Sequence, residues 1–139
     1  MEQITIQTHI DVRVEIIWNA YTSAEDIMEW NRASEDWHCR DAINDLRIGG
    51  KFKNRMEAKD GSVGFDFTGI YTALEPFKKI AYVMPDSRQV TINFNSKKSS
   101  TDIEVIFDAE AENPIETPRQ GWQAILDNFK AYVETTYGN

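Results

Sequence analysis

The feature that most constrains the fold is a long stretch of alternating apolar and polar residues in the middle of the chain. From residue 41 to about residue 110 apolar residues recur at nearly every second position, which is the period of strands with one buried face. Turn-forming pairs such as Gly49-Gly50, Asp60-Gly61 and Pro85-Asp86 divide this stretch at short intervals. Because short connections favour antiparallel neighbours, the stretch predicts about six strands in one antiparallel sheet.

A strand and two short helices are predicted ahead of this stretch. Residues 4–10 alternate apolar and polar and indicate a first strand. Apolar residues from Val14 to Tyr21 recur at spacings of three and four, which is typical of a short amphipathic helix. Ser23, with Asp26 three residues later, has the pattern of an N-cap that begins a second short helix.

The only long helical pattern lies at the C-terminal end of the chain. Thr117-Pro118-Arg119-Gln120 has the form of a capping box with proline at the first helical position, and we expect the helix to run to about Tyr137. Its apolar stripe must be buried against the apolar face of the sheet. The sequence therefore predicts an α+β fold in a single domain, residues 1–139, with a curved antiparallel sheet of about seven strands wrapped around a long C-terminal helix.

Charge and length exclude several classes of partner and architecture. The 15 basic and 23 acidic residues give a formal net charge of -8, which repels nucleic acids and anionic membrane surfaces. A chain of 139 residues is too short for a second, cofactor-binding domain. One cysteine, Cys39, cannot form an internal disulfide, and the sequence has no signal peptide pattern and no membrane-spanning apolar run. We expect a cytoplasmic protein.

Four stretches carry a family resemblance. They are Val14-Glu15-Ile16-Ile17-Trp18 with Trp30, Asp45-Leu46-Arg47-Ile48-Gly49-Gly50-Lys51-Phe52, Gly69-Ile70-Tyr71 with Glu75-Pro76, and Gly121-Trp122 through Ile125-Leu126 and Phe129 to Tyr132. In these the chain resembles the SRPBCC or START-like superfamily, the helix-grip proteins similar to the birch pollen allergen. Within it, the chain resembles the branch similar to the C-terminal domain of the activator of the heat-shock-protein-90 ATPase.

The resemblance covers essentially the whole chain and implies a helix-grip fold. It also implies a cavity between the sheet and the C-terminal helix, which in many members takes small hydrophobic or lipid-like molecules. It implies no reaction, because this branch has no agreed catalytic residues to carry over.

Aromatic and methionine side chains predicted to face the helix are the main candidates for binding such a ligand. Apolar and aromatic walls are typical of small-molecule sites, and methionine adapts to varied ligands. The same residues would also be expected in a dry core, and the sequence leaves both interpretations open. The candidates are Phe52, Met56, Phe65, Phe67, Tyr71, Tyr82, Met84, Phe94, Trp122, Leu126 and Phe129.

Two asparagines interrupt the inward faces of their strands. Asn44 lies at the start of the second strand, where we also expect Leu46 and Ile48 to face inward, and Asn54 lies in the third. A buried amide needs hydrogen-bond partners. Each asparagine is therefore expected to orient a polar group of a ligand, or to bind backbone or water.

The trio Trp37-His38-Cys39 falls in a polar segment that we expect between the second helix and the second strand. There, either Trp37 and His38 cover the mouth of the cavity, with a stacking face and a polar group, or Trp37 anchors the loop and His38 and Cys39 have no role in binding. We predict no metal site, because the only other histidine, His9, lies alone in the first strand. A cysteine–histidine pair adjacent in sequence rarely has the geometry of a nucleophile and its base.

The sequence favours a binding protein over an enzyme. The first hypothesis is a small hydrophobic ligand in the cavity, with no cofactor and no catalytic residue assigned. The alternative is a protein-interaction domain of the co-chaperone kind, and a weaker alternative is a cavity enzyme of the cyclase or hydrolase type. Monomer and homodimer both stay open.

Overall fold

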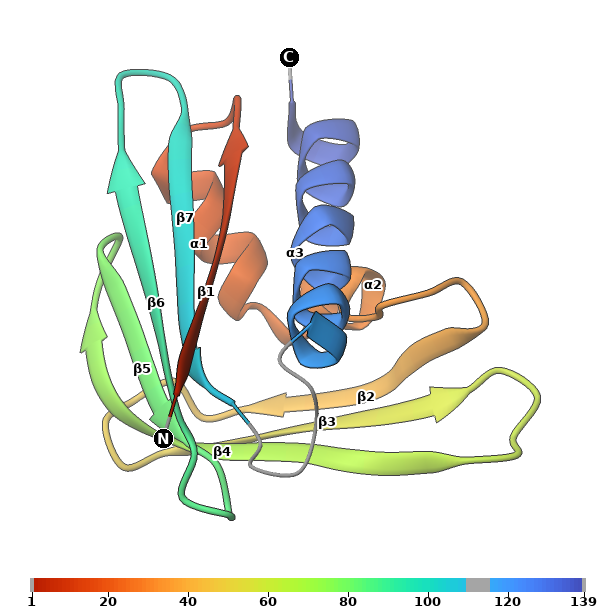
Figure 1. The fold of residues 1–139 in the computed structure, drawn as a ribbon. Helices are drawn as coiled ribbons and strands as arrows, with labels where there is room; N and C mark the ends of the chain where they lie inside the picture. Colours follow the sequence, from red (N-terminus) through yellow and green to blue (C-terminus); the bar gives the residue numbers. More distant parts are fainter. Residues whose placement is uncertain (1, 110–115, 139) are drawn as a thin grey trace.

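A computed structural model describes residues 2–109 and 116–138. It has the predicted α+β composition, with two short helices after the first strand and one long helix at the C-terminal end (Figure 1). The elements are β1 (Gln3–Ile10), α1 (Val14–Thr22), α2 (Ala24–Trp30), β2 (Trp37–Asn44), β3 (Lys51–Ala58), β4 (Gly64–Glu75), β5 (Lys79–Val83), β6 (Gln89–Ser96), β7 (Thr101–Asp108) and α3 (Glu116–Tyr137).

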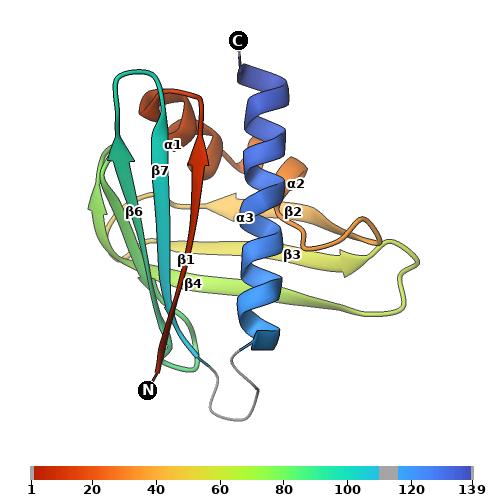
Figure 2. The ribbon, with the colours of Figure 1, turned by 45° about the horizontal axis from the view of Figure 1, so that its top comes forward.

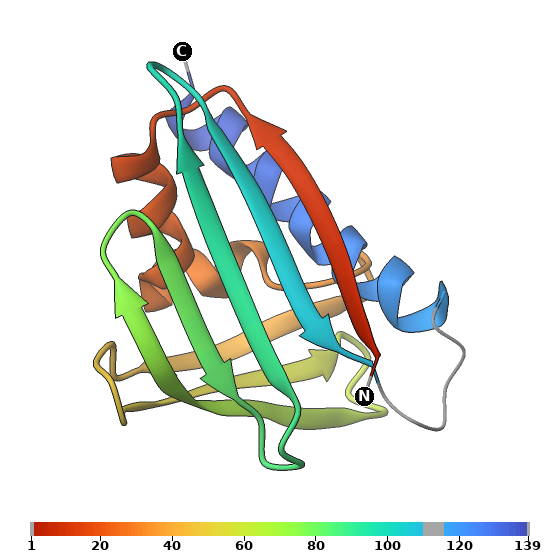
Figure 3. The same ribbon diagram turned by 60° about the vertical axis from the view of Figure 1, so that its left-hand side comes forward.

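The strands form one antiparallel sheet in the order β1-β7-β6-β5-β4-β3-β2. Consecutive strands from β2 to β7 are neighbours, as short connections predict, and β1 adds to the far side of β7. The sheet bends strongly, so that β2, β3 and β4 run across the direction of β1, β6 and β7 (Figures 1 and 3). This curvature wraps the sheet around α3 and confirms the predicted architecture.

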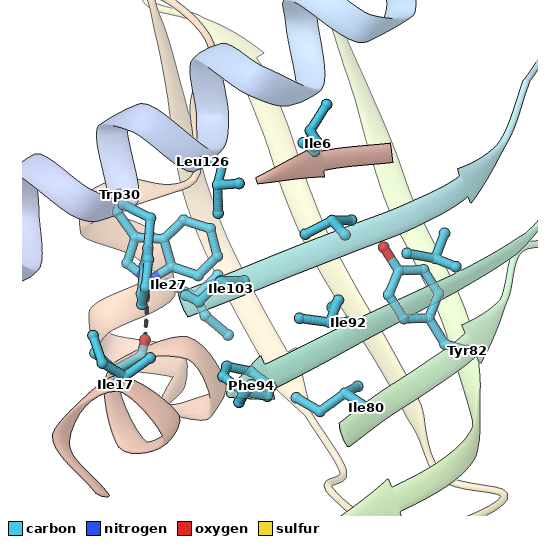
Figure 4. Packing of buried hydrophobic residues seen from close by; sticks show 14 of the residues in the cluster. Ile6, Ile17, Ile27, Trp30, Ile80, Tyr82, Ile92, Phe94, Ile103 and Leu126 are labelled. Carbon is cyan, nitrogen blue, oxygen red and sulfur yellow. Dashed lines mark hydrogen bonds between the residues drawn. The ribbon is translucent and has the colours of Figure 1, made fainter. Parts of the chain in front are cut away.

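The core lies on the concave side of the sheet. Isoleucines from several strands face the helices there, and Leu126 points from α3 toward them (Figure 4). Trp30 of α2 is 5% exposed, and its Nε1 donates a hydrogen bond of 3.0 Å to the carbonyl of Ala20 in α1. This bond joins α2 to α1.

Polar side chains attach α2 to the C-terminal half of α3. Asp26 is buried, and its Oδ1 accepts hydrogen bonds from the hydroxyls of Tyr132 and Tyr137. One turn earlier in α3, Asn128 Nδ2 donates to the carbonyl of Trp30 at 2.7 Å. The C-terminal half of α3 is therefore held against α2 by bonds that satisfy a buried carboxylate.

The N-terminal half of α3 is attached to the edge strand β1 instead. Arg119 Nη1 donates to the carbonyl of Thr5 at 3.0 Å, and Gln123 Nε2 donates to the carbonyl of Gln7 at 3.3 Å. Figure 2 shows α3 beside β1 and passing over β2, β3 and β4. The helix is thus held along β1, at one side of the sheet, and crosses β2, β3 and β4.

The second strand differs from the sequence prediction. β2 begins at Trp37 and ends at Asn44, so Leu46 and Ile48 are not inward strand residues but lie in the following loop, 39% and 65% exposed. The loop is a tight turn whose Gly50 N–H bonds to the carbonyl of Arg47 at 2.8 Å. Apolar and polar residues alternate in this turn as they do in a strand. A period of two over a few residues does not by itself distinguish a turn from a strand.

The helix starts were predicted closely, but not their chemistry. α2 begins after Ser23 as expected, yet the Ser23 side chain makes no capping hydrogen bond. α3 runs from Glu116 to Tyr137, and the proposed cap depends on the side chain of Thr117, of which the structure describes only the backbone. None of the helices in the described part of the chain has a stretch long and apolar enough to cross a membrane.

Candidate ligand-binding cavity

A cavity of about 380 Å³ lies between the concave face of the sheet and the N-terminal half of α3. Four residues of α3 form its roof, and the strands β3, β4 and β5 supply most of its floor. The α3 residues are Gly121, Trp122, Ile125 and Leu126, and the sheet residues are Ile6, Phe52, Asn54, Met56, Phe65, Phe67, Tyr71, Ile80, Tyr82, Ile92 and Val105.

The remaining wall comes from the two short helices and from turns. It consists of Tyr21, Thr22, Ile27, Trp30, Asn31, Ala33 and Arg88. The predicted candidates came from the sheet, the long helix and the segment with Trp37 and His38, so all seven of these residues were missed. The spacing of α1 and the quoted family stretch could have pointed to Tyr21 and Trp30, but no pattern in the sequence marks Arg88, which comes from the β5–β6 turn.

Most of the predicted candidates meet at this cavity. Phe52, Asn54, Met56, Phe65, Phe67, Tyr71, Tyr82, Trp122 and Leu126 all line it, whereas Trp37, His38, Asn44, Met84, Phe94 and Phe129 do not. Inward strand parity identified side chains on the concave face. It could not tell which of these side chains lie under the N-terminal half of α3, where the cavity is.

The two excluded phenylalanines pack between elements. Phe94 of β6 contacts Trp18 and Tyr21, with ring centroids 5.3 and 5.7 Å apart. Phe129 of α3 contacts Tyr21 and Trp30 at 5.1 and 4.8 Å. Both rings therefore join the short helices to the rest of the core, and Met84 is likewise buried, at 5% exposure.

The trio Trp37-His38-Cys39 forms the first three residues of β2 and is not a separate segment over the cavity mouth. Trp37 supports the rim, because its ring lies 5.9 Å from that of the lining residue Phe65. His38 points toward Glu57 on the neighbouring strand, with Nε2 3.9 Å from Oε1. Burial raises the pKa of the Cys39 thiol to about 11, so it stays protonated at neutral pH and is a poor nucleophile.

Phe52 is the centre of the aromatic floor. Its ring lies 4.7 Å from Tyr82, 5.5 Å from Tyr71 and 5.8 Å from Phe67. Gly69, opposite Phe52 in the β3–β4 pair, gives this ring its place, because a Cβ there would come within 2.5 Å of the ring. Glycine at position 69 therefore leaves room for the Phe52 ring beside the neighbouring strand.

Three tyrosines supply hydroxyl groups to a mostly apolar wall. Burial is the main cause that raises the pKa of Tyr71 to about 12, and it raises the pKa values of Tyr21 and Tyr82 further. All three hydroxyls therefore stay neutral at physiological pH. The Tyr71 hydroxyl donates a hydrogen bond of 2.5 Å to Asn44 Oδ1. Asn44 does not itself line the cavity, but through this bond it orients a residue that does.

Asn54 is the polar group without a protein partner. It lies on the inward face of β3 and is 8% exposed, and its Oδ1 accepts no hydrogen bond from the residues that the structure describes. Across residues 2–109 and 116–138, no group of three or more His, Cys, Asp or Glu is arranged to hold a metal ion. The cavity offers hydrogen bonds and apolar contact.

A curved antiparallel sheet that closes over a long C-terminal helix and leaves an apolar cavity defines a helix-grip protein. The chain belongs to the AHSA1 family, the activator of Hsp90 ATPase homolog 1-like proteins, whose family pattern matches residues 11–134. This confirms the resemblance noted in the sequence.

Solved structures agree with this assignment. The chain is 42% identical to the AHSA1-like protein from Aeromonas hydrophila, with a TM-score of 0.94 over 99% of this chain and 96% of that one. A protein from Cytophaga hutchinsonii is 41% identical, with a TM-score of 0.83 over 96% and 92% of the two chains. A protein from Nitrosomonas europaea shares the fold at 16% identity, with a TM-score of 0.84 over 99% and 97%. No curated protein matches the chain.

Proposed function

We propose that the protein binds a small, mostly apolar molecule in the cavity under α3. The observation that carries this proposal is the cavity itself, about 380 Å³ among closely packed aromatic side chains. Protein interiors hold few voids larger than a water molecule, because unfilled space forfeits packing contacts. Mostly apolar walls with a few convergent polar groups are the usual form of a small-molecule site.

Methionine methyl groups report directly on this proposal. Met56 lines the cavity, whereas Met28 on α2 is 39% exposed and Met84 is buried outside the cavity. In protein labelled with carbon-13 at the methionine methyl groups, naphthalene is expected to shift the Met56 resonance saturably and to leave Met28 and Met84 nearly unchanged. Uniform shifts, or none, would contradict binding at this site.

Gly121 offers a matched pair of variants for the same test. It lines the cavity in α3, and a Cβ added there meets no atom within 4 Å. Gly121→Phe would direct a ring into the open space, whereas Gly121→Ala adds one methyl group and improves helix propensity. We expect naphthalene to bind the alanine variant as it binds the unchanged protein, and at least about tenfold more weakly to the phenylalanine variant. Equal binding by all three would place the ligand elsewhere.

A second candidate function, binding a protein partner, is favoured by apolar side chains on the outside of the sheet. Ile43 is 57% exposed, Ile48 65% and Ile70 40%, and the loop that carries Ile48 lies beside β4 through the bond from Gly49 N–H to the Tyr71 carbonyl. The family description names the Hsp90 ATPase as the target of the activators. A pull-down with that ATPase tests this function: binding by the unchanged protein and not by Ile48→Glu supports it, and no binding at low salt rejects it.

A further inference from the structure

We propose that Asn54 is a selectivity residue of the cavity, and that it accepts a hydrogen bond from a neutral ligand bearing a hydroxyl or N–H group. This inference rests on the proposed binding function and specifies the chemistry of the ligand. It assigns to one side chain a role that apolar contact alone does not give.

The amide oxygen of Asn54 has no hydrogen-bond partner among the described residues, and this has a cost in free energy. Asn54 Oδ1 is buried and accepts nothing from the described residues. Leaving a buried acceptor without a hydrogen bond is unfavourable, and most buried polar groups in proteins have a partner. Asn54 lines the cavity, and rotation about its terminal amide torsion, which is broad and roughly two-fold, can turn the oxygen toward the open space without moving β3. A donor on the ligand would then supply the missing bond.

The surroundings of Asn54 make an ordered water a poor substitute. Its cross-strand neighbours are Ala42 and Phe67, and its neighbours on the same face of β3 are Phe52 and Met56. All four side chains are apolar. A buried water usually makes about three hydrogen bonds, and beside Asn54 these side chains would supply none of them. A ligand can bring its own donor together with the apolar surface that these neighbours favour.

The structure also indicates that the ligand is uncharged. A carboxylate has acceptors only, so it cannot donate to Asn54 Oδ1, and a bond from Asn54 Nδ2 to it would still leave that oxygen without a partner. Arg88 is the one cationic side chain among the described lining residues, and its Nε already donates to Asp86 Oδ2 at 2.7 Å. Burying an anion over the aromatic floor would therefore cost its hydration with little return.

Three naphthalene compounds of similar size distinguish a ligand that donates a hydrogen bond from one that only accepts and from an anion. 2-Naphthol donates a hydrogen bond, 2-methoxynaphthalene only accepts one, and 2-naphthoate is an anion. By calorimetry we expect 2-naphthol to bind the unchanged protein about tenfold more tightly than 2-methoxynaphthalene, the usual size of one good hydrogen bond, and 2-naphthoate to bind most weakly. Asn54→Leu should remove the preference for 2-naphthol and retain binding of 2-methoxynaphthalene.

Controls keep the outcome decisive. Asn95→Leu makes the same change at an exposed position of β6 and should keep the full preference. Asn54→Ala repeats the test with a smaller side chain if the leucine variant does not fold. Equal affinity for 2-naphthol and 2-methoxynaphthalene in the unchanged protein, or a preference that survives both Asn54 variants, would overturn the selectivity proposal and leave the binding function standing. If none of the three compounds, nor naphthalene, binds, both proposals fail.

Discussion

The hydroxyl of Tyr71 donates a hydrogen bond of 2.5 Å to Asn44 Oδ1. Asn44 Nδ2 in turn donates to the carbonyl of Thr22 at 2.6 Å, so a single amide joins β4, β2 and the end of α1. Asn54, ten residues later on the adjacent strand, also faces inward but leaves its oxygen without a partner in the described chain. The two asparagines are alike in sequence context and opposite in what their replacement should do.

Asn44→Ala should destabilise the protein. The change leaves the Tyr71 hydroxyl and the Thr22 carbonyl without their partner, and an unsatisfied buried group costs about 1–3 kcal/mol. We expect a loss of about 2–3 kcal/mol in the free energy of unfolding, measured by urea denaturation. Tyr71→Phe removes only one of the two bonds and should cost less. A loss under about 0.5 kcal/mol for Asn44→Ala would show that the bridge contributes little.

Asn54→Leu should stabilise the ligand-free protein or leave its stability unchanged. Leucine is of similar size and removes an acceptor that has no partner, so the free energy of unfolding is expected to rise by up to about 1–2 kcal/mol. The same denaturation experiment measures this change. A loss of more than about 1 kcal/mol in the free energy of unfolding would contradict this expectation and would mean that the Asn54 amide stabilises the folded protein.

Gly69→Ala should disturb the floor of the cavity. The added methyl group would contact the Phe52 ring, and its nearest approach to Tyr82 would be 3.0 Å. Overpacking of this kind typically costs about 1–3 kcal/mol, and here it should also move the Phe52 ring into the cavity. Denaturation measures the cost, and the Met56 methyl resonance should move because Met56 faces the same space. Gly61→Ala, in the β3–β4 turn at φ +78°, is a control that also costs stability but should leave Met56 unchanged.

Stability should depend on His9 near neutral pH. Hydrogen bonds with Asp102 and then Asp11, at 2.5 and 2.9 Å, raise the pKa of His9 above its ordinary value of 6.5. Protonated His9 therefore stabilises the folded state fully below about pH 6.5, and this contribution is lost as the pH rises through the higher folded-state pKa. His9→Gln should flatten that part of the dependence, measured as urea midpoints at about pH 6 and pH 8. The same fall with pH in the glutamine variant would assign it to another group.

Strand periodicity predicted the sheet well because most strands have one buried and one exposed face. β7 shows this clearly: Ile103, Val105 and Phe107 are each at most 2% exposed and alternate with partly exposed residues. Periodicity is a poor guide where the backbone leaves regular strand geometry. A bulge between Cys39 and Asp41 changes the parity of β2, and the loop that holds Leu46 and Ile48 turns within a few residues.

The cavity was only partly predictable for a different reason. Parity places a side chain on the concave face, but whether it lines open space depends on the position of α3 along the sheet. Phe52 and Phe94 both face the concave side of the sheet, but only Phe52 lines the cavity under the N-terminal half of α3. That position is set by distant contacts, among them Asn128 with Trp30 and Gln123 with the carbonyl of Gln7, which no local pattern encodes.

The hydrogen bonds from α3 to β1 have a consequence for self-association. β1 forms one edge of the sheet, and an edge strand presents unpaired backbone groups to which another chain can add a strand. Arg119 and Gln123 occupy two of these groups, the carbonyls of Thr5 and Gln7. A copy that paired along β1 would have to displace both side chains. The helix that roofs the cavity therefore also protects the β1 edge of the sheet against the addition of a strand from another copy.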